Sequence, residues 1–238
     1  MPRKKFARPD GRKADEIRPL SMRIGVIKNA DGSAEIRLGG NWIIAAVYGP
    51  KEHHPRFKVS QERAIVNCRY HMVPYSVPER KSPRPSRREG EISMVIREAL
   101  APALILEEFP ESGIDIFIEV LQAEGSTRVT SINVAALALA EAGLPMRDLV
   151  SACAAGKYQD HIVVDVGEIE DKQGQADLPV ALMPNLNQIT LLQMDGHLTH
   201  DELKEALDVA IGGARHIHEM QTEALKGAIQ KMRTLEST

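Results

Sequence analysis

Residues 120–145 read VLQAEGSTRVTSINVAALALAEAGLP and contain the change of period on which the fold depends. The stretch leaves a segment of alternating apolar residues, turns at Gly-Ser-Thr, and continues as an alanine-rich run that predicts a helix from about Arg128 to Glu141. Gly143 and Pro145 follow as signals that end a helix. The stretch therefore predicts a strand, a tight turn and a closely packed helix.

Upstream of this stretch the pattern is mostly that of strands. Residues 22–40 predict a hairpin around Asn-Ala-Asp-Gly. Three further segments predict strands, namely 42–49, 64–73 and 114–122. Residues 90–109 have apolar residues at helical spacing, and Pro102 within them predicts a kink.

Downstream the same plan is repeated. Four segments predict strands, namely 149–157, 161–167, 176–183 and 188–194. A long helix follows from Thr199, where Thr-His-Asp-Glu forms a capping box. The sequence thus predicts a duplicated α+β fold with mixed sheets and packed helices, its halves spanning 1–150 and 151–238 in one compact unit.

Composition narrows the class of protein. The 238 residues are 43% hydrophobic, which is enough for a sizeable core, and the formal net charge is −3. No apolar run is long enough to predict a transmembrane helix, and no apolar segment follows the basic start as in a signal peptide. Cys68 and Cys153 fit reduced core positions better than a disulfide. We expect a soluble, cytoplasmic protein.

Arg128 lies at a helix start, where backbone N–H groups lack partners and a partial positive charge accumulates. Gly125, Ser126 and Thr127 would let a phosphate approach, and the guanidinium would add two parallel donors. The same residues also fit a plain helix cap with Arg128 in water. The lack of a following Gly-Lys pair excludes a Walker loop.

Asp171 and Asp177 lie on either side of a turn at Gly174, directly before a hydrophobic strand. Two carboxylates so placed suit a metal clamp, an acid with its helper, or an ordinary solvated acidic turn. The eight histidines have no zinc-ligand spacing. No Ser-His-Asp or Cys-His spacing supports covalent catalysis.

Residues 80–88, RKSPRPSRR, hold five cations and no anion. Such a run fits a solvated loop or a track for a polyanion.

The order and spacing of seven motifs across nearly the whole chain resemble the ribonuclease PH family. They are RPDGR (8–12), AAVYGPKE (45–52), RYHMVPYS (69–76), PSRREGEIS (85–93), QAEGSTR (122–128), AGLPMRDLV (142–150) and EDKQGQADLP (170–179). The segment YHMVPYSVPERK (70–81) is most similar to the exosome branch of that family, and the chain as a whole resembles the catalytic ring subunits of archaea. The resemblance implies duplicated ribosomal-protein-S5-like units. It also implies phosphate-dependent, 3′-to-5′ removal of nucleotides from RNA, with the reverse reaction adding tails.

The resemblance further implies roles for three groups of residues. The phosphate site is Gly125, Ser126, Thr127 and Arg128. The catalytic pair, which also holds the expected Mg²⁺, is Asp171 and Asp177. The RNA contacts are Arg87, Arg88, Arg80, Lys81 and, beside a central RNA passage, Arg63.

Two departures from the family pattern stand out. Residues 124–127 read Glu-Gly-Ser-Thr, where the family usually has aspartate, a small residue, glycine, and serine or threonine. Asn41 and Trp42 stand where the family tends to have a small polar pair, and Trp42 fits a subunit contact or the face of the sheet. Neither departure removes a charged group.

The implied partners are RNA, a homologous inactive subunit in a ring of three heterodimers, and a trimeric RNA-binding cap. Two alternatives are a non-catalytic ring subunit that binds RNA and a hydrolytic or tRNA-trimming ribonuclease PH. Because the chain keeps Arg128, Asp171 and Asp177, the sequence favours the enzyme.

Overall fold

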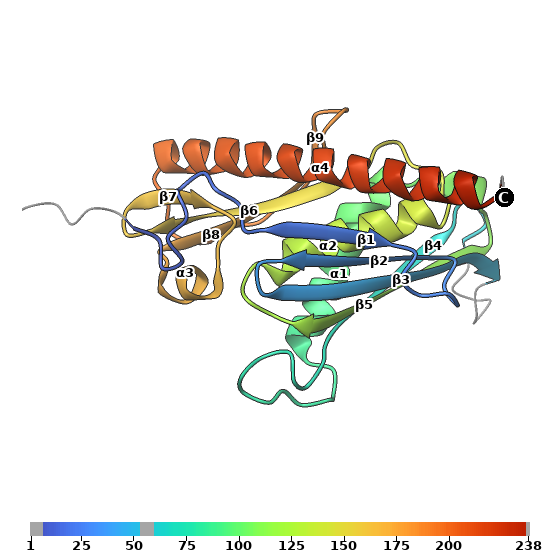
Figure 1. Cartoon of the computed structure of the whole chain (residues 1–238), viewed down its shortest axis with the longest axis horizontal. Coiled ribbons are helices and arrows are strands. Elements are labelled where there is room, and N and C mark those ends of the chain that lie inside the picture. Colours follow the sequence, from blue (N-terminus) through green and yellow to red (C-terminus); the bar gives the residue numbers. More distant parts are fainter. Residues whose placement is uncertain (1–6, 53–59, 237–238) are drawn as a thin grey trace, which may run out of the picture.

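The computed structural model describes residues 7–52 and 60–236, which form two sheets with helices packed against them (Figure 1). The strands of the first sheet are β1 (Leu20–Ile24), β2 (Gly32–Leu38), β3 (Asn41–Glu52), β4 (Ile65–Met72) and β5 (Ser112–Gln122). Their spatial order is β1-β2-β3-β5-β4. Only the β4–β5 pair among these is parallel, so this sheet is mixed.

The second sheet comes from the C-terminal half of the chain. Its strands are β6 (Ser151–Tyr158), β7 (His161–Val164), β8 (Ala176–Met183), β9 (Gln188–Leu192) and β10 (Asp195–Gly196). The order is β10-β8-β6-β7, with β9 also paired to β8, and these pairs are antiparallel. The strands predicted for both halves are confirmed.

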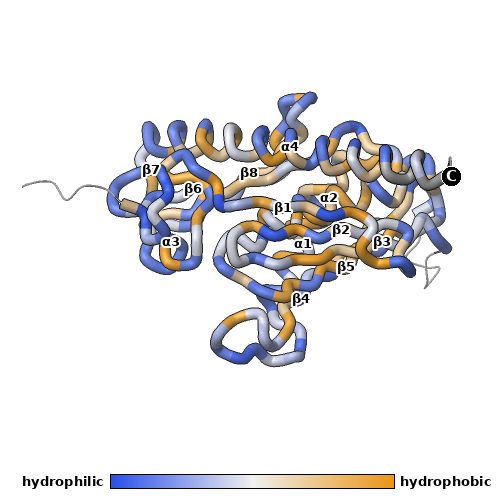
Figure 2. Tube along the Cα trace, in the orientation of Figure 1, coloured by the Kyte–Doolittle hydropathy of each residue, from blue (hydrophilic) through white to orange (hydrophobic). Residues whose placement is uncertain are grey.

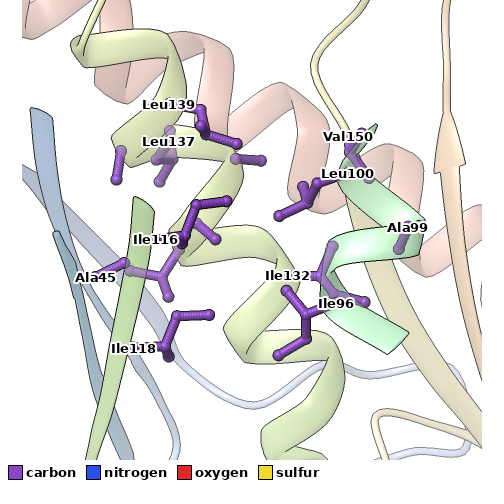
Figure 3. Packing of buried hydrophobic residues seen from close by; sticks show 14 of the residues in the cluster. Ala45, Ile96, Ala99, Leu100, Ile116, Ile118, Ile132, Leu137, Leu139 and Val150 are labelled. Atoms are coloured by element: carbon purple, nitrogen blue, oxygen red, sulfur yellow. The ribbon is translucent and has the colours of Figure 1, made fainter. Parts of the chain in front are cut away.

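Helix α2 (Thr127–Glu141) is enclosed by the rest of the molecule. Every residue from Val129 to Leu139 is buried, which fits a helix that is apolar nearly all round. Small residues allow the close approach, since a Cβ on Gly32 of β2 would lie 2.2 Å from the carbonyl oxygen of Ala138. Figure 3 shows α2 side chains packed with those of β5 and α1 in the main core.

Helix α4 (His200–Glu236) runs across both sheets along the top of Figure 1. The predicted capping box starts it, because the amide of Glu202 donates to Thr199 Oγ1 and the amide of Thr199 donates to Glu202 Oε2. Its apolar stripe covers the second sheet, and Leu225 reaches the main core. Figure 2 shows the hydrophobic stretches gathered on the strands and on α2.

Helix α1 (Arg87–Leu100) is shorter than the sequence pattern suggested. The predicted kinked helix over 90–109 is wrong, because the chain leaves the α-helix before Pro102 and continues as the 3₁₀ turns η2 (Ala101–Ala103) and η3 (Leu106–Glu108). Proline lacks an amide hydrogen and its ring clashes with the preceding turn, which ends the helix here.

The acidic segment also differs from its predicted form. Residues expected in a turn form a short helix, α3 (Glu168–Gln173), which ends at Gly174. Glu170 starts it by accepting a hydrogen bond from the amide of Gly167 at 2.8 Å. The sequence signal was this acidic first turn, which suits the positive end of a helix.

Cys68 and Cys153 are free thiols, as predicted, and burial raises the pKa of each to about 12. No helix within the described residues is long and apolar enough to cross a membrane.

Candidate active site

The turn before α2 leaves the start of the helix without a side-chain cap. Ser126 is the N-cap residue, in the left-handed region at φ 54° and ψ 28°, and its side chain makes no capping hydrogen bond. Its hydroxyl donates to the carbonyl of Val166 at 2.7 Å, and the hydroxyl of Thr127 pairs with Tyr70 Oη at 3.0 Å. The plain helix cap allowed by the sequence is therefore not what forms. The amides at this helix start keep their attraction for an anion.

Gly125 brings this turn against the acidic segment. Its φ is 76°, and a Cβ at this position would lie 2.7 Å from the amide nitrogen of Glu168 and the carbonyl carbon of Gly167. Only glycine meets both demands. The contact places the turn of the first half directly beside α3 of the second half.

One interpretation of the sequence placed the Arg128 side chain in water. The structure instead holds it partly buried. Its side chain is 24% exposed, with Nη2 at 3.3 Å from Glu91 Oε1. Nη1 donates to Gln193 Oε1 at 2.5 Å. The Nε atom is buried and has no hydrogen-bond partner within the described part of the chain. Two neighbours thus orient the guanidinium, and its Nε hydrogen has no partner among the described residues.

Asp177 lies on β8, directly across from Asp195 on β10. Its Oδ1 atom is buried without a hydrogen-bond partner among the described residues. Burial raises the pKa of this carboxyl to about 6, the negative charge of Asp171 adds to the rise, and Arg128 opposes it. A carboxyl with a pKa in this range can donate or accept a proton near neutral pH.

One cavity of about 600 Å³ joins these groups. The residues singled out from the sequence that line it are Gly125, Ser126, Thr127, Arg128, Asp171, Asp177, Arg88 and Lys81. The turn, α1, α3 and β8 each contribute, so both halves of the chain build the cavity. Cations and carboxylates therefore face a shared space that is large enough for a nucleotide.

Three of the predicted RNA-contacting residues do not line the cavity. Lys81 and Arg88 line the cavity. Their sequence neighbours Arg80 and Arg87 are exposed and extend the basic surface outward. Arg63 is exposed in the segment before β4, away from the other four in the sequence. The basic run is not one loop, because Arg87 and Arg88 form the first turn of α1 behind a capping box of Ser86 and Glu89.

Sequence reasoning missed several polar residues of the cavity. They are Tyr70, Glu91, Glu168, Lys172, Gln193 and Asp195. Glu91 follows Arg88 by three positions in a helix, and Lys172 follows Glu168 by four, so helical spacing could have indicated these pairs. Gln193 and Asp195 meet the others only through the pairing of β8 with its neighbours, which single-sequence patterns do not reveal.

Two arginines near the N-terminus form buried ion pairs with carboxylates of the acidic segment, residues 165–177. Arg8 contacts both carboxylate oxygens of Glu170, at 2.6 and 2.7 Å, and both side chains are buried. Arg18 does the same to Asp165, at 2.6 and 2.8 Å. Paired charges of this geometry tolerate burial, whereas either carboxylate alone would not. The RPDGR motif thus contributes to the placement of α3.

Comparison with protein families gives two adjoining matches. Residues 16–145 match domain 1 of the 3′ exoribonuclease family, RNase PH, and residues 148–213 match domain 2. The boundary falls between α2 and β6, where the first sheet and its helices end.

Known relatives match over most of their length. The chain is 60% identical over 219 residues to the exosome complex component Rrp41 of Thermococcus onnurineus, covering 92% of this chain and 88% of that protein. For the same component of Cenarchaeum symbiosum the identity is 55% over 218 residues, covering 92% and 90%.

Solved structures agree on the architecture. Rice Rrp46 superposes with a TM-score of 0.83 at 21% identity, covering 92% of this chain and 100% of that one, which shows the shared fold. The Archaeoglobus fulgidus exosome with RNA bound to its active site gives a TM-score of 0.78 at 25% identity, covering 90% and 92%.

Proposed function

The chain belongs to the 3′ exoribonuclease family, and from this we propose that its cavity shortens RNA from the 3′ end by phosphorolysis. The observation that carries the proposal is the juxtaposition of an uncapped helix start and Arg128 with Asp177 in one cavity. The helix start and Arg128 suit an attacking phosphate. Asp177 suits the proton or the metal ion that the leaving oxygen needs.

Binding is the first task of the site, because inorganic phosphate and the terminal phosphodiester are both anions. The amides of the turn and Arg128 hold the phosphate, and Arg88 and Lys81 offset the charge of the RNA. A phosphate oxygen then attacks the terminal phosphorus in line with the departing 3′ oxygen. The products are a nucleoside diphosphate and an RNA shorter by one nucleotide.

Asp177 serves the leaving group. Its pKa of about 6 lets a fraction of the molecules carry the proton that the 3′ oxygen takes up. Asp171 lies across from it on α3 and keeps that pKa raised through repulsion. In the reverse direction Asp177 takes the proton from the RNA 3′ hydroxyl, and the nucleoside diphosphate then extends the chain.

As the alternative to carrying the proton, the ionised carboxylate pair fits a magnesium ion. Mg²⁺ binds through one or two carboxylates together with substrate phosphates, and Oδ1 of Asp177 is buried without a partner in the described structure. The described residues contain no group of three or more potential ligands, so water and phosphate oxygens would complete the shell. Bound there, the ion would stabilise the charge that develops on the leaving oxygen.

RNA reaches the cavity along the basic surface. Arg88 and Lys81 stand at the cavity, Arg87 and Arg80 extend the surface outward, and Arg63 guides RNA at a separate point, beside a central passage. These contacts are to phosphates, so we expect little base preference and a strong dependence on salt.

The chain acts within a ring. Its relatives are components of the exosome complex, so we propose three heterodimers with a homologous inactive subunit and a trimeric RNA-binding cap. The outer strands of the first sheet, β1 and β4, are candidate contacts, as is Trp42, whose ring centroid lies 4.3 Å from the Arg37 guanidinium. Two free thiols fit the reducing cytoplasm as its location.

Product analysis tests the proposed reaction. The assembled ring is incubated with a short RNA, with and without inorganic phosphate. Nucleoside diphosphates that appear only with phosphate support phosphorolysis, and monophosphates without phosphate would indicate hydrolysis. Absence of any product would favour the non-catalytic ring subunit.

A further inference from the structure

Two buried side chains form hydrogen bonds with the backbone of the proposed phosphate-binding turn, residues 124–127. Arg18 Nη1 donates to the carbonyl of Glu124 at 2.5 Å. Asn41 Nδ2 donates to the carbonyl of Gly125 at 2.6 Å, and Asn41 Oδ1 accepts from the amide of Glu124 at 2.6 Å. The exposed fractions of Arg18 and Asn41 are 5% and 1%. Neither residue lines the cavity.

These contacts determine where the amides of the turn point. In a planar trans peptide the C=O and the next N–H point in opposite directions. Since the carbonyls of Glu124 and Gly125 point to Arg18 and Asn41, the N–H groups of Gly125 and Ser126 point away from them. No described residue accepts a hydrogen bond from either N–H group. Successive free N–H groups of this kind form a concave anion site.

The two gripping residues are themselves fixed. Asn41 is the first residue of β3, behind the tight Gly39-Gly40 turn, and the amide of Gly40 donates to Glu124 Oε2 at 2.5 Å. Arg18 is anchored at its other donors by Asp165. The turn is thus tied to a hairpin of the first sheet and to the acidic segment of the second.

We propose that Asn41 and Arg18 are positioning residues that set the affinity for inorganic phosphate by orienting the amides of Gly125 and Ser126. The inference rests on the proposed phosphorolytic function and adds residues that touch neither phosphate nor RNA. Asn41 carries the sharper test, because removing Arg18 would also leave Asp165 buried without its partner.

The test is Asn41→Asp, which keeps the shape and the acceptor for the Glu124 amide but sets a carboxylate oxygen against the Gly125 carbonyl. The repulsion turns that peptide and withdraws the Ser126 amide from the phosphate. In the assembled ring the KM for inorganic phosphate rises about tenfold or more, while kcat at saturating phosphate stays within about threefold. RNA affinity without phosphate is unchanged.

Asn133 offers a matched control. It is also buried, and its amide likewise bonds to the backbone at both ends, with Nδ2 donating to the carbonyl of Ala152 at 2.8 Å and Oδ1 accepting from the amide of Ala152 at 2.7 Å. Ala152 belongs to β6, and neither it nor Asn133 lines the cavity. Asn133→Asp lowers the melting temperature but leaves the KM for phosphate as it is in the wild type.

The outcomes separate the inference from the proposed function. Lack of phosphate-dependent product from the wild-type ring overturns the function and the inference with it. An active wild type with an unchanged KM in Asn41→Asp, or an equal rise in Asn133→Asp, overturns the inference alone. If Asn41→Asp does not assemble, Asn41→Ser, which removes the grip without adding charge, is measured against the same criteria.

Discussion

At the scale of single residues, Gly125 stands where backbone conformation and packing both exclude a side chain. In Gly125→Ala the positive φ costs about 1–2 kcal/mol, and the new methyl group pushes against the start of α3. We expect phosphorolysis to fall at least about tenfold, because the turn and Asp171 move apart. Steady-state rates at varied phosphate measure the loss.

Gly143 provides the control for this substitution. Its φ is 73°, but nothing lies within 4 Å of a Cβ added there. Gly143→Ala therefore suffers the same backbone strain without the collision. Equal losses of activity in the two variants would show that strain alone, and not the contact with α3, explains the effect.

Arg128 is the second residue with a defined expectation. Arg128→Ala removes the donors to phosphate, so kcat/KM for phosphate falls by about 10² or more. Arg128→Lys keeps the charge but loses the planar fork, and recovers little. The side chain is partly buried, so the melting temperature falls by a few degrees while the fold survives; circular dichroism checks this. Trimming at the wild-type rate in Arg128→Ala would remove this residue from the site.

Asp177, the proposed proton donor, also makes the stability of the protein depend on pH. Burial raises its pKa from 3.8 to about 6, so between these pH values the folded state binds more protons than the unfolded state. Stability from this group is therefore present below pH 3.8 and is lost as the pH rises to about 6. Above that pH the buried charge costs on the order of 3 kcal/mol.

Asp177→Asn removes both the charge and the proton. We expect a higher melting temperature than the wild type at pH 8, no difference near pH 4, and a collapse of turnover with RNA binding retained. Asp208→Asn, an exposed change on α4, serves as the control. A variant that is less stable than the wild type at pH 8, or that turns over normally, contradicts the assignment.

At the scale of elements, the sequence predicted strands and long helices well because their periods are local. The alternation of 114–122 and the capping box at Thr199 mark β5 and α4 without knowledge of their neighbours. Helix α3 has six residues, too few for a period, and its start depends on Glu170 being held by the distant Arg8. The grip of Asn41 on the turn likewise joins residues 84 positions apart.

The start of α1 gives an element-level prediction. Ser86 and Glu89 form a capping box beneath Arg87 and Arg88. Ser86→Ala costs about 1 kcal/mol of stability, and fraying of this turn weakens RNA binding a few-fold. Fluorescence titration with a short RNA measures it. Thr199→Ala, in the capping box of α4, loses similar stability without an effect on RNA; an equal effect would mean that the α1 cap has no special role.

At the scale of the whole molecule, the cationic surface of one chain is short. The net charge is −3, and only Arg88 and Lys81 of the basic run line the cavity. Processive trimming needs RNA held by several phosphates at once. We expect the isolated chain to trim long RNA poorly and to gain processivity when its homologous partner completes the ring. Mass measurement and trimming assays before and after mixing test this; a fully processive monomer would contradict it.

The buried pairs of Arg8 with Glu170 and of Arg18 with Asp165 join residues 162 and 147 positions apart. During synthesis both arginines leave the ribosome long before their carboxylates exist. The N-terminal segment therefore stays in water, and the grip of Arg18 on the turn lacks its anchor, until most of the chain has been translated. An unfinished chain contains the turn before α2 and Arg128 but neither Asp171 nor Asp177. Because both carboxylates lie in the last third of the chain, the complete cavity forms only late in synthesis.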